Sequence, residues 1–147
     1  MQSSRFELRL AEEPWAFFII CLVILLAPLW WVFSWLFSVV LHELGHLMMA
    51  KFLSVPVYGI SIGISGARID MAPMDPGREF LCAAGGPIMG IILLLLGRWM
   101  PLVAVCAFFH TAWNLIPVGK RDGARMLHSL WALVRKIPCK PGEERVQ

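Results

Sequence analysis

Two histidines and a glutamate lie close together in the stretch SVVLHELGHLMMA, residues 38–50, which is otherwise almost entirely apolar. On a helix, His42 and His46 project from the same face, so their two imidazoles can bind one zinc ion. Zinc lowers the pKa of a bound water towards about 7, and Glu43 can then accept its proton. This set of groups is suited to peptide hydrolysis. The alternative is that both histidines only form hydrogen bonds and that Glu43 pairs with a distant cation.

A hydrolytic zinc site usually has three protein ligands, so the two histidines need a partner from elsewhere in the chain. The candidate residues with suitable side chains are His110, His128, Asp70, Asp75, Glu79 and Asp122. We expect His110 to have a polar packing role, with ligation as the alternative. We expect His128 to lie at an interface.

The elements that must position these groups are predicted to lie in a membrane. The chain has 147 residues, of which 59% are hydrophobic and only 16% are charged, against about 25% charged in a soluble domain. Three runs contain no charged residue, and they cover residues 14–42, 80–97 and 99–119. A membrane-spanning helix needs about 20 residues, so the second and third runs fit one span each.

The first apolar region is too long for a single span. A helix that continued from Trp15 to Leu53 would be roughly 58 Å long, whereas the hydrocarbon core of a bilayer is about 30 Å thick. Pro28 disfavours helix at the residue before it. We therefore expect two helices, at about 14–27 and 30–53, with one long kinked helix as the alternative. The predicted fold is an all-α polytopic membrane protein with about four transmembrane helices.

The basic residues predict how these spans are oriented. With four spans, all 13 lysines and arginines except Arg98 lie in the N-terminal segment, in residues 51–78 or after the last span. By the positive-inside rule these segments, including both termini, face the cytoplasm. We expect the membrane to be a bacterial inner membrane. Lys51 lies five residues beyond His46, so the metal site is expected about 8 Å from that anchor and towards the cytoplasmic side.

Between the second and third spans, the segment VPVYGISIGISGARIDM, residues 55–71, is rich in β-branched residues and glycine. It predicts a short strand or hairpin, bounded by Pro56 and by the turn-rich sequence APMDPG. An unpaired edge of this hairpin can bind an extended peptide as an added strand. After Asp122, apolar residues at helical spacing predict an amphipathic or interfacial helix.

A second motif lies in HTAWNLIPVGKRDGARML, residues 110–127. Its spacing, N-x2-P-x4-D-G, is made by Asn114, Pro117, Asp122 and Gly123. Together with HELGH, this motif resembles the site-2 protease family of intramembrane zinc metalloproteases, over about residues 30–130. The resemblance implies that Asp122 is the third zinc ligand. Between its two motifs the family also has a Gly-Pro element that opens a helix, matched here by Gly86 and Pro87.

The resemblance implies a function: zinc-dependent endopeptidase activity on peptide bonds in or near transmembrane segments. Its partners would be a transmembrane protein or peptide substrate, the lipid bilayer and, as an option, a regulatory membrane protein or an oligomer; nothing suggests nucleic acid. The layout resembles the small branch of the family, without a PDZ or CBS domain. We divide the chain into an N-terminal cytoplasmic segment (1–13), the protease core (14–136) and a polar tail (137–147).

Several alternatives remain open at this stage. Pro117 should interrupt the fourth helix, and the break can turn Asp122 towards the two histidines, although Asp122 also fits as the N-cap of the next helix. Asn114 can hold substrate backbone or make a packing hydrogen bond. Lys120 and Arg121 can favour an acidic substrate flank or contact lipid phosphates. The rival functions are a catalytically silent membrane chaperone or scaffold, and a small metal transporter.

Overall fold

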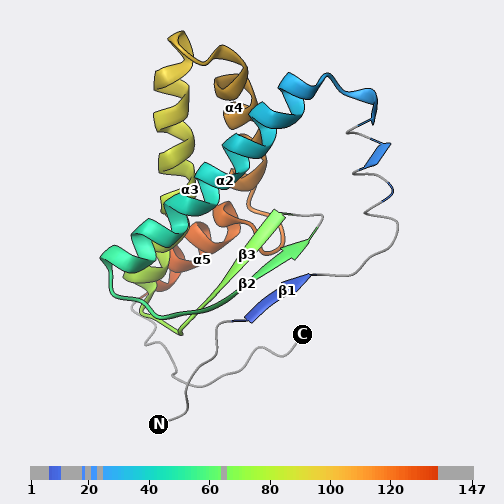
Figure 1. Ribbon diagram of the computed structural model, residues 1–147. Helices are drawn as coiled ribbons and strands as arrows, with labels where there is room; N and C mark the ends of the chain where they lie inside the picture. Colours follow the sequence, from blue (N-terminus) through green and yellow to red (C-terminus); the bar gives the residue numbers. More distant parts are fainter. Residues whose placement is uncertain (1–6, 11–17, 19–20, 23–24, 64–65, 136–147) are drawn as a thin grey trace.

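The computed structural model describes residues 7–10, 18, 21–22, 25–63 and 66–135. Three helices stand against one another (Figure 1): α2 (Leu29–Phe52), α3 (Pro76–Leu95) and α4 (Pro101–Leu115). A short 3-10 helix, η1 (Leu96–Arg98), connects α3 to α4. The helix α5 (Asp122–Val134) and a small sheet lie at one end of this group. The predicted combination of a helical protein with a small β element is therefore confirmed.

The chain breaks where the sequence placed a turn. Residues 18, 21–22 and 25–26 are helical, Ala27 forms a bend, and Pro28 has an extended ψ of 133°. The helix α2 then begins at Leu29. This break supports two helices over one, although much of the first predicted helix lies outside the described residues.

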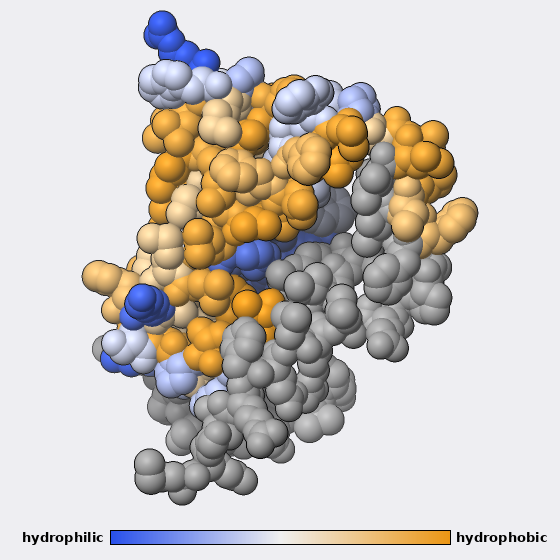
Figure 2. All heavy atoms as spheres, in the orientation of Figure 1, coloured by the Kyte–Doolittle hydropathy of each residue, from blue (hydrophilic) through white to orange (hydrophobic). Residues whose placement is uncertain are grey.

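The surface of the helices is strongly hydrophobic. Figure 2 shows hydrophobic residues over most of this face, with hydrophilic residues at its upper and lower ends and in a recessed area near its middle. Trp30 is 77% exposed, Trp99 72% and Phe33 62%. Soluble monomers rarely expose a contiguous apolar surface of this extent. The exposed side chains therefore suit contact with lipid.

Two helices in the described part of the chain, Leu29–Phe52 and Pro76–Arg98, are long and apolar enough to cross a membrane. The helix α4 has 15 residues, which is a length of roughly 22 Å. It is therefore shorter than the span predicted over 99–119. The count of four spans stays a prediction.

The start of α3 differs from the expected one. Asp75 caps this helix by accepting a hydrogen bond from the backbone N–H of Arg78 at 3.0 Å, and Pro76 occupies the first turn, where its missing N–H costs nothing. Gly86 and Pro87 lie in the interior of α3. The prediction that they open a helix is therefore wrong, because Asp75 and Pro76 supply the start signal ten residues earlier.

The helices α2 and α3 approach each other so closely that their backbones touch. A Cβ atom on Gly45 would overlap the carbonyl group of Gly85, and one on Gly85 would overlap that of Gly45. Small residues allow this approach between apolar helices. The contact presses the face of α2 that carries the two histidines against the backbone of α3.

The sheet has the order β1-β2-β3. Its strands are β1 (Glu7–Leu10), β2 (Val57–Gly63) and β3 (Gly66–Met71). The antiparallel pair β2–β3, from Val57 opposite Met71 to Gly63 opposite Gly66, confirms the predicted hairpin. The strand β1 pairs in parallel with β2 and was not expected from the sequence. Among the described strands, β3 therefore lies at the edge of the sheet and pairs with β2 alone.

A small apolar cluster fixes the root of the hairpin. Ala50 of α2, Val55 before β2 and Cys82 of α3 are buried together, and the N–H of Val55 donates to the carbonyl of Ala50 at 2.8 Å. The hairpin therefore starts and ends beside the helices that carry the candidate metal ligands.

Candidate metal centre

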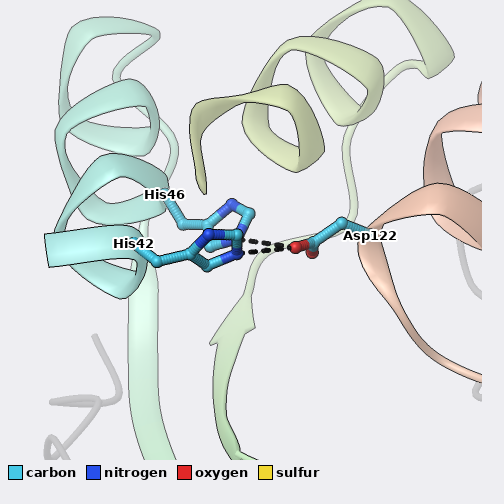
Figure 3. Close-up of side chains that lie close together, drawn as sticks. All are labelled: His42, His46 and Asp122. Atoms are coloured by element: carbon cyan, nitrogen blue, oxygen red, sulfur yellow. Dashed lines mark hydrogen bonds and ion pairs between the residues drawn. The ribbon is translucent and has the colours of Figure 1, made fainter. Parts of the chain in front are cut away.

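Three candidate ligands from distant parts of the sequence converge on one point (Figure 3). His42 and His46 point from α2 towards Asp122, at the first position of α5. Nε2 of His42 lies 3.0 Å from Oδ2 of Asp122, and Nε2 of His46 lies 3.1 Å from the same oxygen. All three residues are buried, and their ligand atoms lie within 4.8 Å of one another.

The end of α4 explains how Asp122 reaches the histidines. The helix α4 ends at Leu115, and Ile116 adopts an extended ψ of 122°, as the residue before a proline prefers. The chain then returns so tightly that a Cβ on Gly123 would overlap the carbonyl of Leu115. The predicted interruption at Pro117 is confirmed. The N-cap of α5 is Arg121, so the alternative that Asp122 is the cap is wrong.

Gly86 forms the wall of the site on the side of α3. A Cβ atom on this residue would lie less than 3.0 Å from Nε2 of both His42 and His46, closer than real Cβ atoms come to their neighbours. Such a methyl group would occupy the space between the two ligand nitrogens. The glycine therefore leaves a cradle the size of one atom beside both imidazoles.

The hydrogen bonds of His46 indicate which group fits between this residue and Asp122. Its Nδ1 lies 2.8 Å from the carbonyl of Cys82 and 3.3 Å from the backbone nitrogen of Gly86, and because a carbonyl only accepts, the shorter contact requires the proton on Nδ1. A neutral His46 then turns the lone pair of Nε2 towards Asp122. Two acceptors at 3.1 Å are compatible only with a proton or a metal cation between them.

The distances among the ligands fit zinc. In tetrahedral coordination with bonds of about 2.0–2.1 Å, neighbouring ligand atoms lie roughly 3.3 Å apart. The two distances from Asp122 to the imidazole nitrogens, 3.0 and 3.1 Å, are close to that spacing. Two imidazoles and one carboxylate are also a donor set found in hydrolytic zinc sites. The three residues are thus close enough, and of the right types, to bind a metal.

The protonation of Asp122 favours the same role. Burial alone would raise the pKa of this carboxyl group, but its contacts with the imidazoles of His42 and His46, which hold a proton between nitrogen and oxygen when no metal is bound, outweigh burial and keep the pKa well below its usual value. Asp122 is therefore ionised at neutral pH, which is the form that a metal ligand requires.

Glu43 lies half-buried beside the ligands. Its carboxylate interacts electrostatically with His46, Asp122 and Arg125. Arg125 lies three residues after Asp122 on α5, so one helical face presents both residues to this region. The placement is compatible with the predicted role of Glu43, since the carboxylate belongs to the same group of charges as the ligands.

The other predicted residues have separate positions. Asn114 forms a hydrogen bond with His110 at 3.0 Å, and His110 is not a member of the metal-binding group found among the described residues. His128 is exposed on α5. The guanidinium of Arg121 stacks over Trp113 at 4.1 Å. The predicted polar packing role of His110 is thus the one that the structure supports.

Two features of the site were missed by the sequence reasoning. The carbonyl of Cys82 orients His46, and the glycine pair Gly45 and Gly85 allows α3 to cover the histidines. The run CAAGG, residues 82–86, contained a signal, because consecutive small residues in an apolar helix indicate close helix packing.

Comparisons with known proteins agree with this geometry. No protein-family model matches the chain. A candidate zinc metalloprotease from Synechocystis sp. is 27% identical over 143 residues, which cover 86% of this chain and 35% of that protein. A zinc metalloprotease from Methanocaldococcus jannaschii is 31% identical over 107 residues, which cover 63% of this chain and 32% of that protein.

A solved structure is also similar. The site-2 protease from Methanocaldococcus jannaschii matches with a TM-score of 0.60 and 27% sequence identity, over 80% of this chain and 62% of that chain. The chain spans about a third of the length of the curated relatives that it matches.

Proposed function

The chain belongs to the site-2 protease family, and on that premise we propose that it is a zinc-dependent intramembrane endopeptidase. Its substrates would be membrane proteins, cleaved in or near their transmembrane segments. The observation that carries the proposal is the convergence of His42, His46 and Asp122 beside the carboxylate of Glu43. These four residues come from two helices that only the fold brings together.

His42, His46 and Asp122 would hold the zinc ion. When bound, zinc supplies a Lewis acid that polarises a peptide carbonyl and acidifies water. The chain contributes the orientation of the ligands: the carbonyl of Cys82 fixes His46, and the backbone at Gly86 closes the site on one side. Glu43 would accept a proton from the attacking water and later donate one to the leaving amine.

We further propose that substrate is presented as an extended strand. A helix shields its peptide carbonyls, so a transmembrane substrate must unwind locally before attack. The side of β3 away from β2, which is paired with no described strand, can take up such a segment, since β1 already covers the other side of β2. Asn114 is a candidate to hold the backbone of the unwound segment by its amide group.

The proposed membrane placement follows from the same surfaces. The exposed apolar side chains of α2, α3 and α4 would face lipid, and Lys51, exposed in the last turn of α2, would lie near the headgroups. The site would then lie within the membrane, towards the cytoplasmic side. The exposed Leu130 and Trp131 on α5 suit an interfacial helix.

A catalytically silent scaffold is the alternative, and the complete ligand set does not favour it. A scaffold has no need to keep three zinc ligands and a carboxylate in one buried site. The same residues also fit a purely structural metal. A cleavage assay separates a protease from a protein with a structural metal, because only the protease cleaves a substrate.

The decisive experiment compares the wild-type protein with Glu43→Gln. We expect the variant to bind zinc with unchanged stoichiometry and to lose cleavage by about 10²- to 10⁴-fold, the usual contribution of a general base. Proteomics of membrane-protein fragments from cells that express either form would identify substrates. Wild-type turnover by Glu43→Gln would refute the mechanism, and loss of zinc by this variant would show that Glu43 has a structural role instead.

A further inference from the structure

One buried histidine near the site has no role in the mechanism above. His110 is 7% exposed and lies near the end of α4. Its ring meets the ring of His42 edge-on, with centroids 4.7 Å apart and an interplanar angle of 88°. On α2, Trp35 also meets His110 at 5.6 Å and 88°. The His110 side chain is thus inserted between two rings that lie two helical turns apart on one face of α2.

The two histidine ligands are held in different ways. His46 has a hydrogen bond from Nδ1 to the carbonyl of Cys82. His42 is 1% exposed, and its Nδ1 has no hydrogen-bond partner among the described residues. A metal-ligating histidine normally donates its second N–H to a carbonyl or carboxylate, which fixes the ring. His42 lacks that restraint, so the rings packed against it must set its orientation.

His110 also has a polar contact on the other side. The side-chain amide of Asn114 donates from Nδ2 to Nε2 of His110 at 3.0 Å, because an amide nitrogen can only donate. In this contact Nε2 of His110 is the acceptor, so this nitrogen carries no proton. Because the amide group is planar, it also sets the direction of the Asn114 carbonyl oxygen. One side chain therefore restrains a zinc ligand and the candidate substrate-binding asparagine.

We propose that His110 is a positioning residue that orients His42 through its ring and Asn114 through its Nε2 atom. The proposal rests on the proposed function, because it explains the contact with His42 by zinc binding and the contact with Asn114 by substrate binding. It differs from a mere packing role in one respect. The ring and the acceptor atom serve two different neighbours, so two substitutions can separate them.

His110→Phe keeps a ring but removes the acceptor. We expect its zinc affinity to stay within about twofold of wild type. Cleavage measured at saturating zinc should fall about tenfold, which is what the loss of one such hydrogen bond produces. Asn114→Ala should show the same cleavage defect with unchanged zinc affinity.

His110→Gln keeps an acceptor at a similar distance along the side chain but removes the ring. We expect zinc to bind about 10- to 100-fold more weakly, as for the loss of other groups that orient a ligand. The absorption bands of Co²⁺ bound in place of zinc should also shift, because a freed His42 changes the ligand field. Cleavage at saturating zinc should fall less than in His110→Phe.

The measurements are zinc affinity by competition with a chromophoric chelator, the Co²⁺ spectrum, and cleavage of one identified membrane substrate, all with the full chain in detergent. His128→Gln is the control, since His128 is exposed on α5. Wild-type zinc affinity and an unchanged Co²⁺ spectrum in His110→Gln would overturn the ring contact. Wild-type cleavage by His110→Phe would overturn the contact to Asn114. If the wild-type protein itself binds no zinc, the proposed function fails together with this inference.

Discussion

Replacing Gly86 with alanine tests the metal centre most directly, because the change adds one carbon atom beside both histidine ligands. The new Cβ would lie less than 3.0 Å from Nε2 of His42 and of His46, whereas ordinary contacts are about 3.5–4.0 Å. Either α3 withdraws by roughly 1 Å or the imidazoles turn away. Withdrawal would separate the touching backbones at Gly45 and Gly85.

The size of the effect follows from the cost of that overlap. Overpacking by one methyl group costs about 1–3 kcal/mol. Zinc binding would require the imidazoles to return to their present positions, so this cost appears in the zinc affinity. At 1.4 kcal/mol for each tenfold change, zinc should bind about 5- to 140-fold more weakly to Gly86→Ala than to wild type.

Competition with a chromophoric chelator in detergent measures this difference. Gly77→Ala is the matched control on the same helix, since its Cβ would meet only the flexible carboxylate of Asp75, at 3.2 Å. We expect the control to bind zinc as the wild type does. Equal zinc affinity in Gly86→Ala and wild type, or equal losses in both variants, would refute the assignment of Gly86 to the wall of the site.

Two more predictions follow from the elements that support the site. Gly123→Ala should weaken zinc binding although the residue is not a ligand, because its Cβ would overlap the carbonyl of Leu115 and displace Asp122; unchanged zinc affinity in the same chelator assay would contradict this. Asp75→Ala should lower the free energy of unfolding by about 1 kcal/mol, the usual value of an N-cap, and leave zinc affinity intact, because Asp75 contacts the backbone N–H and the guanidinium of Arg78 and is not one of the candidate ligands. Thermal denaturation checks the second prediction, and a loss of zinc there would show that the start of α3 is coupled to the metal centre.

Local signals in the sequence were sufficient for much of the fold. Pro28 predicted the break before α2, because a proline disfavours helix at the residue before it. The abundance of β-branched residues and glycine in 55–71 predicted the hairpin β2–β3. The strand β1 was missed although residues 6–10, FELRL, alternate apolar and charged side chains, because so short a run is a weak signal and its pairing partner lies about fifty positions away.

The prediction of where α3 begins was wrong because it relied on the resemblance to the family. Gly86 and Pro87 matched a family element in type and order, yet the capping side chain of Asp75 and the ring of Pro76 determine where the helix begins. The importance of Gly86 lies in its missing side chain, which lets a backbone approach two imidazoles. The run of small residues at 82–86 indicates close packing, but which side chains lie against Gly86 depends on how α2 and α3 pack.

By itself, the sequence determined the residue types on which the proposed chemistry depends: two imidazoles one helical turn apart, a carboxylate next to them, and an aspartate after a proline break, all among apolar residues. These are properties of residue type and short spacing, which the chain carries before it folds. Only the tertiary structure decided that Asp122 meets His42 and His46 at 3.0 and 3.1 Å. It also decided that Cys82 orients one ligand, and that His110 packs against the other. Those contacts join residues 36 to 80 positions apart, and they depend on how closely α2, α3 and α4 pack.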